Sequence, residues 1–230
     1  YDGKNWLLER YIINNITTAS LTKLNNKPQT SLPTLAAAFT KGDYTVAVDE
    51  RQEVFSGLPF AKVEVDNLAK TIKGTKIVLD KDFSPQVTVP QMNDYKIIHL
   101  ATHGMLVSGD PENSFILFGN GDRVTLKDIE NWSLPNVDLV VLSACQTGLG
   151  NQLGNGQEIL GLGYQIQLTG AKAAITSLWA VSDGGTQALM DEFYTALKTG
   201  KLTKAEALHT AQLSLLKNNS QFAHPYYWAS

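Results

Sequence analysis

The sequence predicts an α/β fold built on a mostly parallel central sheet with helices on both faces. Three short apolar runs rich in Val, Ile and Leu, at 95–102, 137–144 and 171–179, have the length and composition of buried strands. Segments with helical periodicity separate these runs. Short strands that alternate with helices are typical of parallel βαβ units, so we expect the three strands to share one sheet.

Size and composition indicate one globular domain. The 230 residues are 43% hydrophobic, which is enough for a sizeable core. The net charge is −3 and the Lys and Arg residues are scattered, so no footprint for nucleic acid or an anionic membrane is present. No apolar run approaches the roughly 20 residues that span a bilayer, and no signal-peptide pattern opens the sequence. The single cysteine rules out an internal disulfide framework, so we expect a reducing, cytoplasmic location.

The first part of the chain carries weaker signals than the three runs. We expect strands at 5–15, 44–48 and 76–79, a short helix at 17–23, and loops or edge segments at 25–33, 51–58 and 84–90. A helix is expected from Pro59, which suits a first turn, to a stop at Gly74. Its expected inward residues are Phe60, Val63, Leu68 and Ile72, and its outward charges are Lys62, Glu64, Asp66 and Lys70.

Capping and turn residues mark the later elements. A hairpin is expected at 114–118 and 123–125 around Asn120-Gly121-Asp122, followed by a short helix at 126–131 with Thr125 as its N-cap. A helix at 157–168 should face inward with Ile159, Leu160, Tyr164 and Leu168, and one at 183–198 with Leu189, Phe193 and Leu197. Thr203 and Glu206 form a capping box for a further helix, and the aromatic segment 224–228 is expected to lead into a last strand.

A histidine and the only cysteine follow two of the predicted strands. His103 comes just after the run 95–102, and Cys145 just after the run 137–144. Ligands and reactive groups of open α/β sheets gather at the carboxyl ends of strands. If the two strands are parallel neighbours, imidazole and thiol meet at that edge, where histidine can activate a cysteine nucleophile. By itself, either residue is as well explained as an inert core thiol or a hydrogen-bonded histidine.

Four motifs in fixed order resemble the CHAT family of caspase-like cysteine proteases. They are HLATHG, LVVLSACQTGLG, GAKAAITSLWAVSD and HPYYWA. Such domains often follow tetratricopeptide repeats and are common in cyanobacteria. The resemblance implies a caspase-like (caspase-hemoglobinase) α/β fold and cleavage of peptide bonds. It also implies that this chain is a fragment of a longer protein, with the N-terminal region and the last strand missing. Within it we expect an N-terminal layer at 1–75 and a catalytic core at 76–230.

The resemblance assigns catalytic roles to the histidine and the cysteine. His103 is implied as the base and Cys145 as the nucleophile, in a dyad that needs no third carboxylate. The backbone N–H groups of Gly104 and Cys145 are candidates for an oxyanion hole, because a glycine lets the main chain approach a substrate closely. Of the other histidines, we expect His99 to be a satisfied core residue, and His209 and His224 to be structural.

Substrate specificity is less readable. Ser143 stands two positions before the cysteine, where basic-specific relatives such as metacaspases have Asp, so that source of basic specificity is absent. Asp183 resembles a separase acid that binds arginine, and either lines the first specificity pocket or caps the helix at 184–198. Trp179 is a pocket wall or a core residue. Glu158 is a surface charge or a second pocket acid.

The expected function is that of a cysteine endopeptidase acting on a specific protein partner in a regulatory or defence pathway, with cleavage after a basic residue as one option. The alternatives are a non-catalytic scaffold that keeps the fold and an amidase for a small molecule. The loops 105–113 and 148–156 flank the dyad and contain little apolar surface, so we expect them to order around the substrate. Activation would then come from a partner or a fused repeat domain. No metal or cofactor is expected, since no ligand cluster and no phosphate loop is present in the sequence. The oligomeric state is left open.

Overall fold

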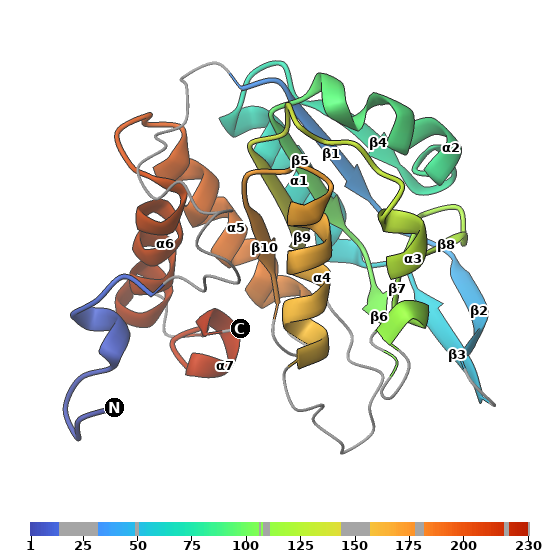
Figure 1. Cartoon of the computed structure of the whole chain (residues 1–230). Helices are drawn as coiled ribbons and strands as arrows, with labels where there is room; N and C mark the ends of the chain where they lie inside the picture. The colour runs from blue at the N-terminus through green and yellow to red at the C-terminus, as the bar shows by residue number, and fades with distance from the viewer. Residues whose placement is uncertain are drawn as a thin grey trace.

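A five-stranded parallel sheet forms the centre of the molecule (Figure 1). The computed structural model describes residues 1–13, 32–48, 51–105, 107, 111–143, 157–177, 182–218 and 221–229, with the backbone alone at 111 and 157–161. The strands lie in the order β10-β9-β5-β1-β4. They are β1 (Thr34–Ala38), β4 (Lys76–Leu79), β5 (Ile97–Ala101), β9 (Leu139–Ser143) and β10 (Ala174–Thr176). All neighbouring pairs are parallel, which confirms the predicted fold class.

Strand β1 is absent from the sequence-based expectation. Its run Thr-Leu-Ala-Ala-Ala has few of the β-branched and aromatic residues that mark strands. All five residues are nevertheless buried, because β1 lies inside the sheet between β5 and β4. The sheet therefore takes strands from both sides of the expected boundary after residue 75: β1 precedes the boundary, and the other four strands follow it.

Helices cover both faces of the sheet, and alternate strand residues point to each. On one face, Ala36 and Ile97 pack in a cluster with α1 (Pro59–Thr71), α5 (Asp183–Leu197) and α6 (Lys204–Asn218). On the other, Leu35 and Ile98 pack against α3 (Leu126–Ile129), α4 (Gln157–Leu168) and the segment of α2 (Pro85–Thr88) and η4 (Val89–Asp94). Figure 1 shows α4 in front of β9 and the pair α5 and α6 beside the sheet. This two-sided burial explains why the strands read as continuous apolar runs.

Two small antiparallel sheets lie beside one end of the central sheet (Figure 1, lower right). One is the hairpin β2 (Asp43–Val48) and β3 (Arg51–Ser56), and the other contains β6 (Gly104–Met105), β7 (Phe115–Leu117) and β8 (Arg123–Thr125). They enclose a third apolar cluster that includes Phe39, Phe55 and Phe115. The expected hairpin and the Thr125 cap are confirmed. The expected loop at 51–58 is wrong, because most of it is β3.

The chain ends differ from expectation. The described part of the predicted strand at 5–15, residues 5–13, contains a 3-10 turn, η1 (Leu7–Glu9), in place of a strand. The segment expected to lead into a last strand is the short helix α7 (Pro225–Trp228). Their aromatic residues pack together, with the ring centroids of Trp6 and Trp228 5.8 Å apart. The apolar character of both segments therefore reflects docking and not strand pairing. The expected helix at 17–23, and 25–31 of the expected loop, lie outside the described residues.

Short helical pieces replace other expected loops. The segment 84–90 begins α2, with Ser84 as its N-cap, and continues into η4. The 3-10 turns η3 (Asp80–Asp82) and η5 (Pro111–Asn113) follow β4 and precede β7. Of the expected loop 105–113, Met105 belongs to β6, while 106 and 108–110 lie outside the described residues, as does the whole expected loop 148–156.

Two helices present a different face from the one expected. In α1, Phe60 and Val63 are exposed, and the buried residues are Ala61, Glu64, Val65 and Leu68. In α4, Tyr164 and Leu168 are exposed while Leu162 and Ile166 are buried; Ile159 and Leu160 lie outside the described side chains. The inward residues of α5 and the capping box of Thr203 and Glu206 are confirmed. In the described part of the chain, no helix has the length and hydropathy to traverse a bilayer.

Candidate active site

The strands that precede His103 and Cys145 are parallel neighbours. In the pairing of β5 with β9, Ala101 stands opposite Ser143, the last residue of each strand. The Thr102 N–H donates to the Ser143 carbonyl 3.2 Å away, so the two chains leave the sheet side by side. His103 follows directly on this edge, and Cys145 itself lies outside the described residues. The juxtaposition of the two strand ends, expected from the sequence, is confirmed.

The His103 imidazole is buried beneath the β2–β3 hairpin, with an exposed fraction of 2%. Its ring makes edge contacts with Phe55 of β3 and Phe39, which follows β1, at centroid distances of 5.3 and 5.7 Å. Nε2 lies 2.7 Å from the carbonyl oxygen of Ser56 at the end of β3. The hairpin thus provides the polar anchor of the ring and, together with Phe39, its apolar wall.

This anchor determines which ring nitrogen carries the proton. A carbonyl oxygen only accepts hydrogen bonds, so Nε2 must be the protonated nitrogen and Nδ1 carries the lone pair. Nδ1 is buried and has no hydrogen-bond partner among the described residues. Burial lowers the pKa of the His103 imidazole, and the bond to the Ser56 carbonyl opposes that change. Without a proton donor at Nδ1 the ring is therefore neutral, and its basic nitrogen is used by no described residue.

Gly104 presents its backbone N–H away from β7. It stands opposite Ile116, and the Leu117 N–H donates to the His103 carbonyl 2.9 Å away. This pattern places Gly104 in a non-hydrogen-bonded pair of the antiparallel ladder, where N–H groups point outward. The N–H is thus not used in pairing with β7, as an oxyanion donor requires.

Ser143 has a different environment from the one expected of a substrate-binding residue. Its side chain is 2% exposed, and Oγ donates to Oε1 of Glu64 in α1 at 2.5 Å. The hydroxyl therefore faces the helix layer below the strand ends. This geometry favours a structural role for Ser143.

Asp183 caps a helix, but not the one expected. The N-cap of α5 is Ser182, whose Oγ accepts a hydrogen bond from the Gly185 N–H. The Asp183 carboxylate instead accepts from the Phe60 N–H of α1 at 2.8 Å. Burial raises the pKa of Asp183, the Phe60 bond lowers it, and the Glu64 charge raises it further. Asp183 is partly buried between the starts of α1 and α5. Trp179, the other predicted pocket residue, lies outside the described residues, as does the Glu158 side chain.

Sequence reasoning missed two residues of this region, Ser56 and Glu64. The β-branched and aromatic pair Val54 and Phe55 was a signal for a strand that would have placed Ser56 near the sheet. Glu64 shares a helix face with Ala61 and Leu68, and a charge on an apolar face is a signal of a buried partner.

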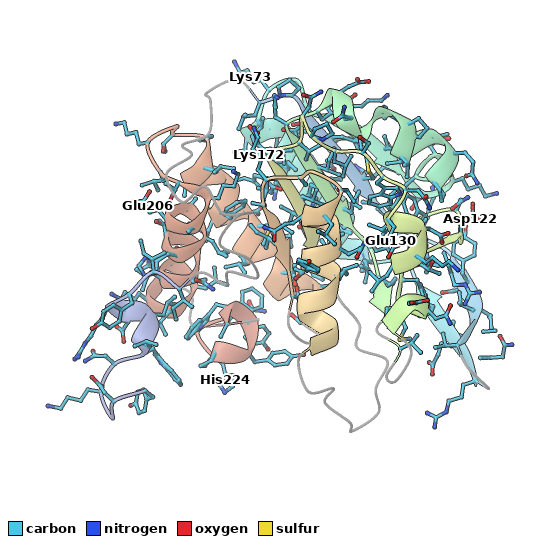
Figure 2. The ribbon with its side chains drawn as sticks, in the orientation of Figure 1. Lys73, Asp122, Glu130, Lys172, Glu206 and His224 are labelled. Carbon is cyan, nitrogen blue, oxygen red and sulfur yellow. The ribbon has the colours of Figure 1, made fainter. Side chains whose placement is uncertain are left out.

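The remaining histidines have structural partners. Nδ1 of His99 contacts the Tyr194 hydroxyl at 2.9 Å, and Nε2 of His209 the Leu8 carbonyl at 2.7 Å. His224, labelled in Figure 2, caps α7 by accepting from the Tyr226 N–H. Among the described residues, no group of three or more His, Cys, Asp or Glu side chains is arranged to hold a metal ion.

Comparisons with known proteins bear on the family and the fold of the chain. A family model described as the CHAT domain matches residues 1–230. Among solved structures, the Arg-specific cysteine proteinase gingipain R (RgpB) superposes with a TM-score of 0.52 and 12% identity, over 85% of this chain and 44% of that one. The complex of Porphyromonas gingivalis RgpB pro- and mature domains gives a TM-score of 0.51 and 11% identity, over 86% and 45%. The chain thus spans less than half the length of these proteins. Among curated proteins, none matches.

The two kinds of likeness carry different weight. At such low identities the solved structures speak for the fold alone, which is caspase-like, as expected. The family model covers the full length of the chain and identifies the family directly. The chain belongs to the CHAT domain family.

Proposed function

We propose that the protein is a cysteine endopeptidase with a catalytic dyad of His103 and Cys145. The observation that carries the proposal is the bare Nδ1 of His103, which is buried and has no partner among the described residues. An unpaired buried acceptor costs about 1–3 kcal/mol, so its retention calls for a use. The only cysteine of the chain follows the neighbouring strand, and its thiol is the natural proton donor to that nitrogen.

The chemistry follows from this arrangement. Nδ1 takes the thiol proton, and the thiolate attacks the carbonyl carbon of the peptide bond. The imidazolium is stabilised by the Ser56 carbonyl and returns the proton to the leaving amine. The N–H groups of Gly104 and Cys145 would hold the oxyanion, and one such donor contributes about 3–4 kcal/mol to lowering the barrier.

For specificity we propose a basic side chain at the cleavage site, paired with Asp183. A carboxylate can accept further hydrogen bonds beside the one from Phe60. The Arg specificity of gingipain R belongs to that protein, but it agrees with the proposed role of an acidic residue on this fold. The substrate would be a protein partner in a regulatory or defence pathway, with activity switched on by an activating partner or a fused repeat domain. A cytoplasmic location, proposed from the single cysteine, would suit the free thiol.

The test is incubation of the protein and its Cys145→Ala variant with a library of short fluorogenic peptides. Cleavage by the parent alone, with a preference for Arg or Lys, would support both the dyad and Asp183. Cleavage with another preference would support the dyad and reject Asp183. If no peptide is cleaved even when candidate protein partners are added, the hypothesis of a non-catalytic scaffold replaces that of a protease.

A further inference from the structure

A buried polar cluster lies between the sheet and the helices α1 and α5. It consists of Glu64, His99, Ser143 and Tyr194, whose exposed fractions are 2%, 0%, 2% and 1%. Glu64 Oε1 accepts from Ser143 Oγ at 2.5 Å and lies 2.9 Å from His99 Nε2. The His99 contact is close, but the ring N–H is not aligned with the carboxylate for a hydrogen bond. One carboxylate thus touches two neighbouring strands.

The Tyr194 hydroxyl supplies this cluster with a hydrogen-bond donor. Burial and the charge of Glu64 raise the pKa of Tyr194 well above its usual value, so the phenol keeps its proton. It can then donate to His99 Nδ1, 2.9 Å away. With that donor, the ring proton of His99 lies on Nε2, the nitrogen 2.9 Å from Glu64. The cluster is therefore a defined arrangement that links α1, α5, β5 and β9.

The cluster lies directly below the reactive strand ends. His99 is on β5, the strand that leads to His103, and Ser143 is the last residue of β9, which leads to Cys145. Both side chains point to the same helix layer, and Glu64 is the group that they share. A displacement of one strand along the other would break a contact to Glu64.

Burying a carboxylate in this space has a large cost in free energy. Removing a charge from water costs several kcal/mol, and apolar residues of similar volume often replace buried ion pairs without loss of stability. The neighbours of Glu64 on the same helix face are apolar: Ala61, Val65 and Leu68. Fixing one register is the best-attested use of such a buried polar group.

We propose that Glu64 is a positioning residue that fixes the ends of β5 and β9 against each other and so aligns His103 with Cys145. The inference rests on the proposed function of the dyad. Glu64 acts through Ser143 and His99. Its loss should therefore reduce the formation of the thiolate without removing the thiol itself.

The experiment measures the rate of Cys145 alkylation by iodoacetamide across pH, which is unambiguous because the chain has one cysteine. In an aligned dyad the thiol proton moves to Nδ1 of His103, so the thiol is ionised at neutral pH, whereas an ordinary cysteine has a pKa of about 8.5. We expect Glu64→Gln to lower the rate about tenfold or more at pH 6.5 and to leave it within twofold at pH 10, where hydroxide supplies the thiolate. A general loss of structure would change both rates.

Asp191→Asn is the matched control. Asp191 is also a partly buried acid between α1 and α5, but it accepts hydrogen bonds from Asn67 and Gln187, both on these helices. Its alkylation profile should match that of the parent. If Glu64→Gln shows no cooperative thermal unfolding transition, and so is not folded, Ser143→Ala is used in its place. Its rate of Cys145 alkylation at pH 6.5 should be at least threefold lower than that of the parent.

The outcomes separate the inference from the proposed function. A parent rate that follows an ordinary thiol titration would reject the dyad and the inference with it. A parent with a lowered thiol pKa and a folded variant with unchanged rates would reject Glu64 alone. Equal losses at both pH values, or an equal loss in the Asp191 control, would also overturn the positioning role.

Discussion

The carbonyl oxygen of Ser56 lies 2.7 Å from Nε2 of His103, although 47 positions separate the two residues. The contact brings the β2–β3 hairpin over the end of the central sheet and fixes the ring with its basic nitrogen unpaired. A side-chain carboxylate in this place would add a charge, whereas the backbone carbonyl orients the ring without one. Several consequences can be measured.

The first prediction concerns pH and the neutral His103 ring. Burial places its folded pKa below the unfolded value of about 6.5. A lowered pKa contributes stability that is fully present above about pH 6.5 and is lost as pH falls through the folded pKa. Urea unfolding at pH 7.5 and 5.5 should therefore show a larger loss of stability for Cys145→Ala, in which no thiol proton can reach the ring, than for the double variant Cys145→Ala with His103→Gln. Equal losses would contradict the neutral, buried ring.

The second prediction concerns Gly57, which follows the anchoring carbonyl. A Cβ at this position would lie 2.2 Å from the Lys41 nitrogen and 2.5 Å from the Thr40 carbonyl carbon, both backbone atoms. Gly57→Ala must therefore shift the end of β3, at a cost of about 1–3 kcal/mol in the free energy of unfolding. It should also slow peptide cleavage, because the Ser56 carbonyl moves with it.

The control for Gly57 is Gly163→Ala in α4. The new Cβ would meet its nearest atom, Oγ1 of Thr176, at 3.7 Å, an ordinary contact. Because alanine is the better helix former, this variant should gain up to about 1 kcal/mol. Destabilisation of both variants to the same extent would show that the tight approach at Gly57 is unimportant.

The third prediction separates two roles of Asp183. Asp183→Ala removes the acceptor for the Phe60 N–H and should cost about 0.5–2 kcal/mol as a lost helix cap. Asp183→Asn keeps an acceptor and removes a carboxylate that burial disfavours, so its stability at pH 7 should stay near that of the parent. Both variants should lose any preference for Arg over Leu at the cleavage site.

Ser182→Ala provides the comparison for Asp183. It removes the cap of α5 and should cost about 1 kcal/mol while keeping the substrate preference. A retained preference for Arg in Asp183→Asn would assign this residue to helix capping alone.

The fourth prediction concerns Asp80, a non-glycine residue with a φ of 50°. Its carboxylate accepts from the Thr40 N–H and hydroxyl and from the Lys41 N–H, which ties the chain after β1 to the end of β4. Asp80→Ala leaves these donors unpaired, at about 1–3 kcal/mol. Asp80→Asn keeps an acceptor, so thermal unfolding should place it between alanine and the parent. An alanine variant as stable as the parent would refute the tie.

Local patterns were sufficient for much of the fold. The continuous apolar runs of β5 and β9 arise because both faces are covered, and the Thr125 cap and the Asn120-Gly121 turn obey rules that involve neighbouring residues only. The parallel pairing of β5 with β9 followed from the alternation of strands and helices. These features brought His103 to the right edge of the sheet.

Other features depend on contacts that no local pattern contains. Strand β1 is rich in alanine, and its place inside the sheet overrides its weak propensity. The face of α1 was misjudged because Glu64 looked like a solvated charge, while its partners His99 and Ser143 lie on distant strands. In β3, Val54 is apolar but exposed, so apolar and polar residues do not alternate in the sequence. The strand that positions Ser56 was therefore not recognised.

The most direct measurement of the proposed dyad is a titration of the thiolate by its ultraviolet absorbance, with Cys145→Ala as the baseline. The parent should show a thiol pKa well below the ordinary value of about 8.5, and His103→Gln should return it to about that value. If both proteins titrate alike near 8.5, His103 does not activate Cys145 and the account of this site is wrong.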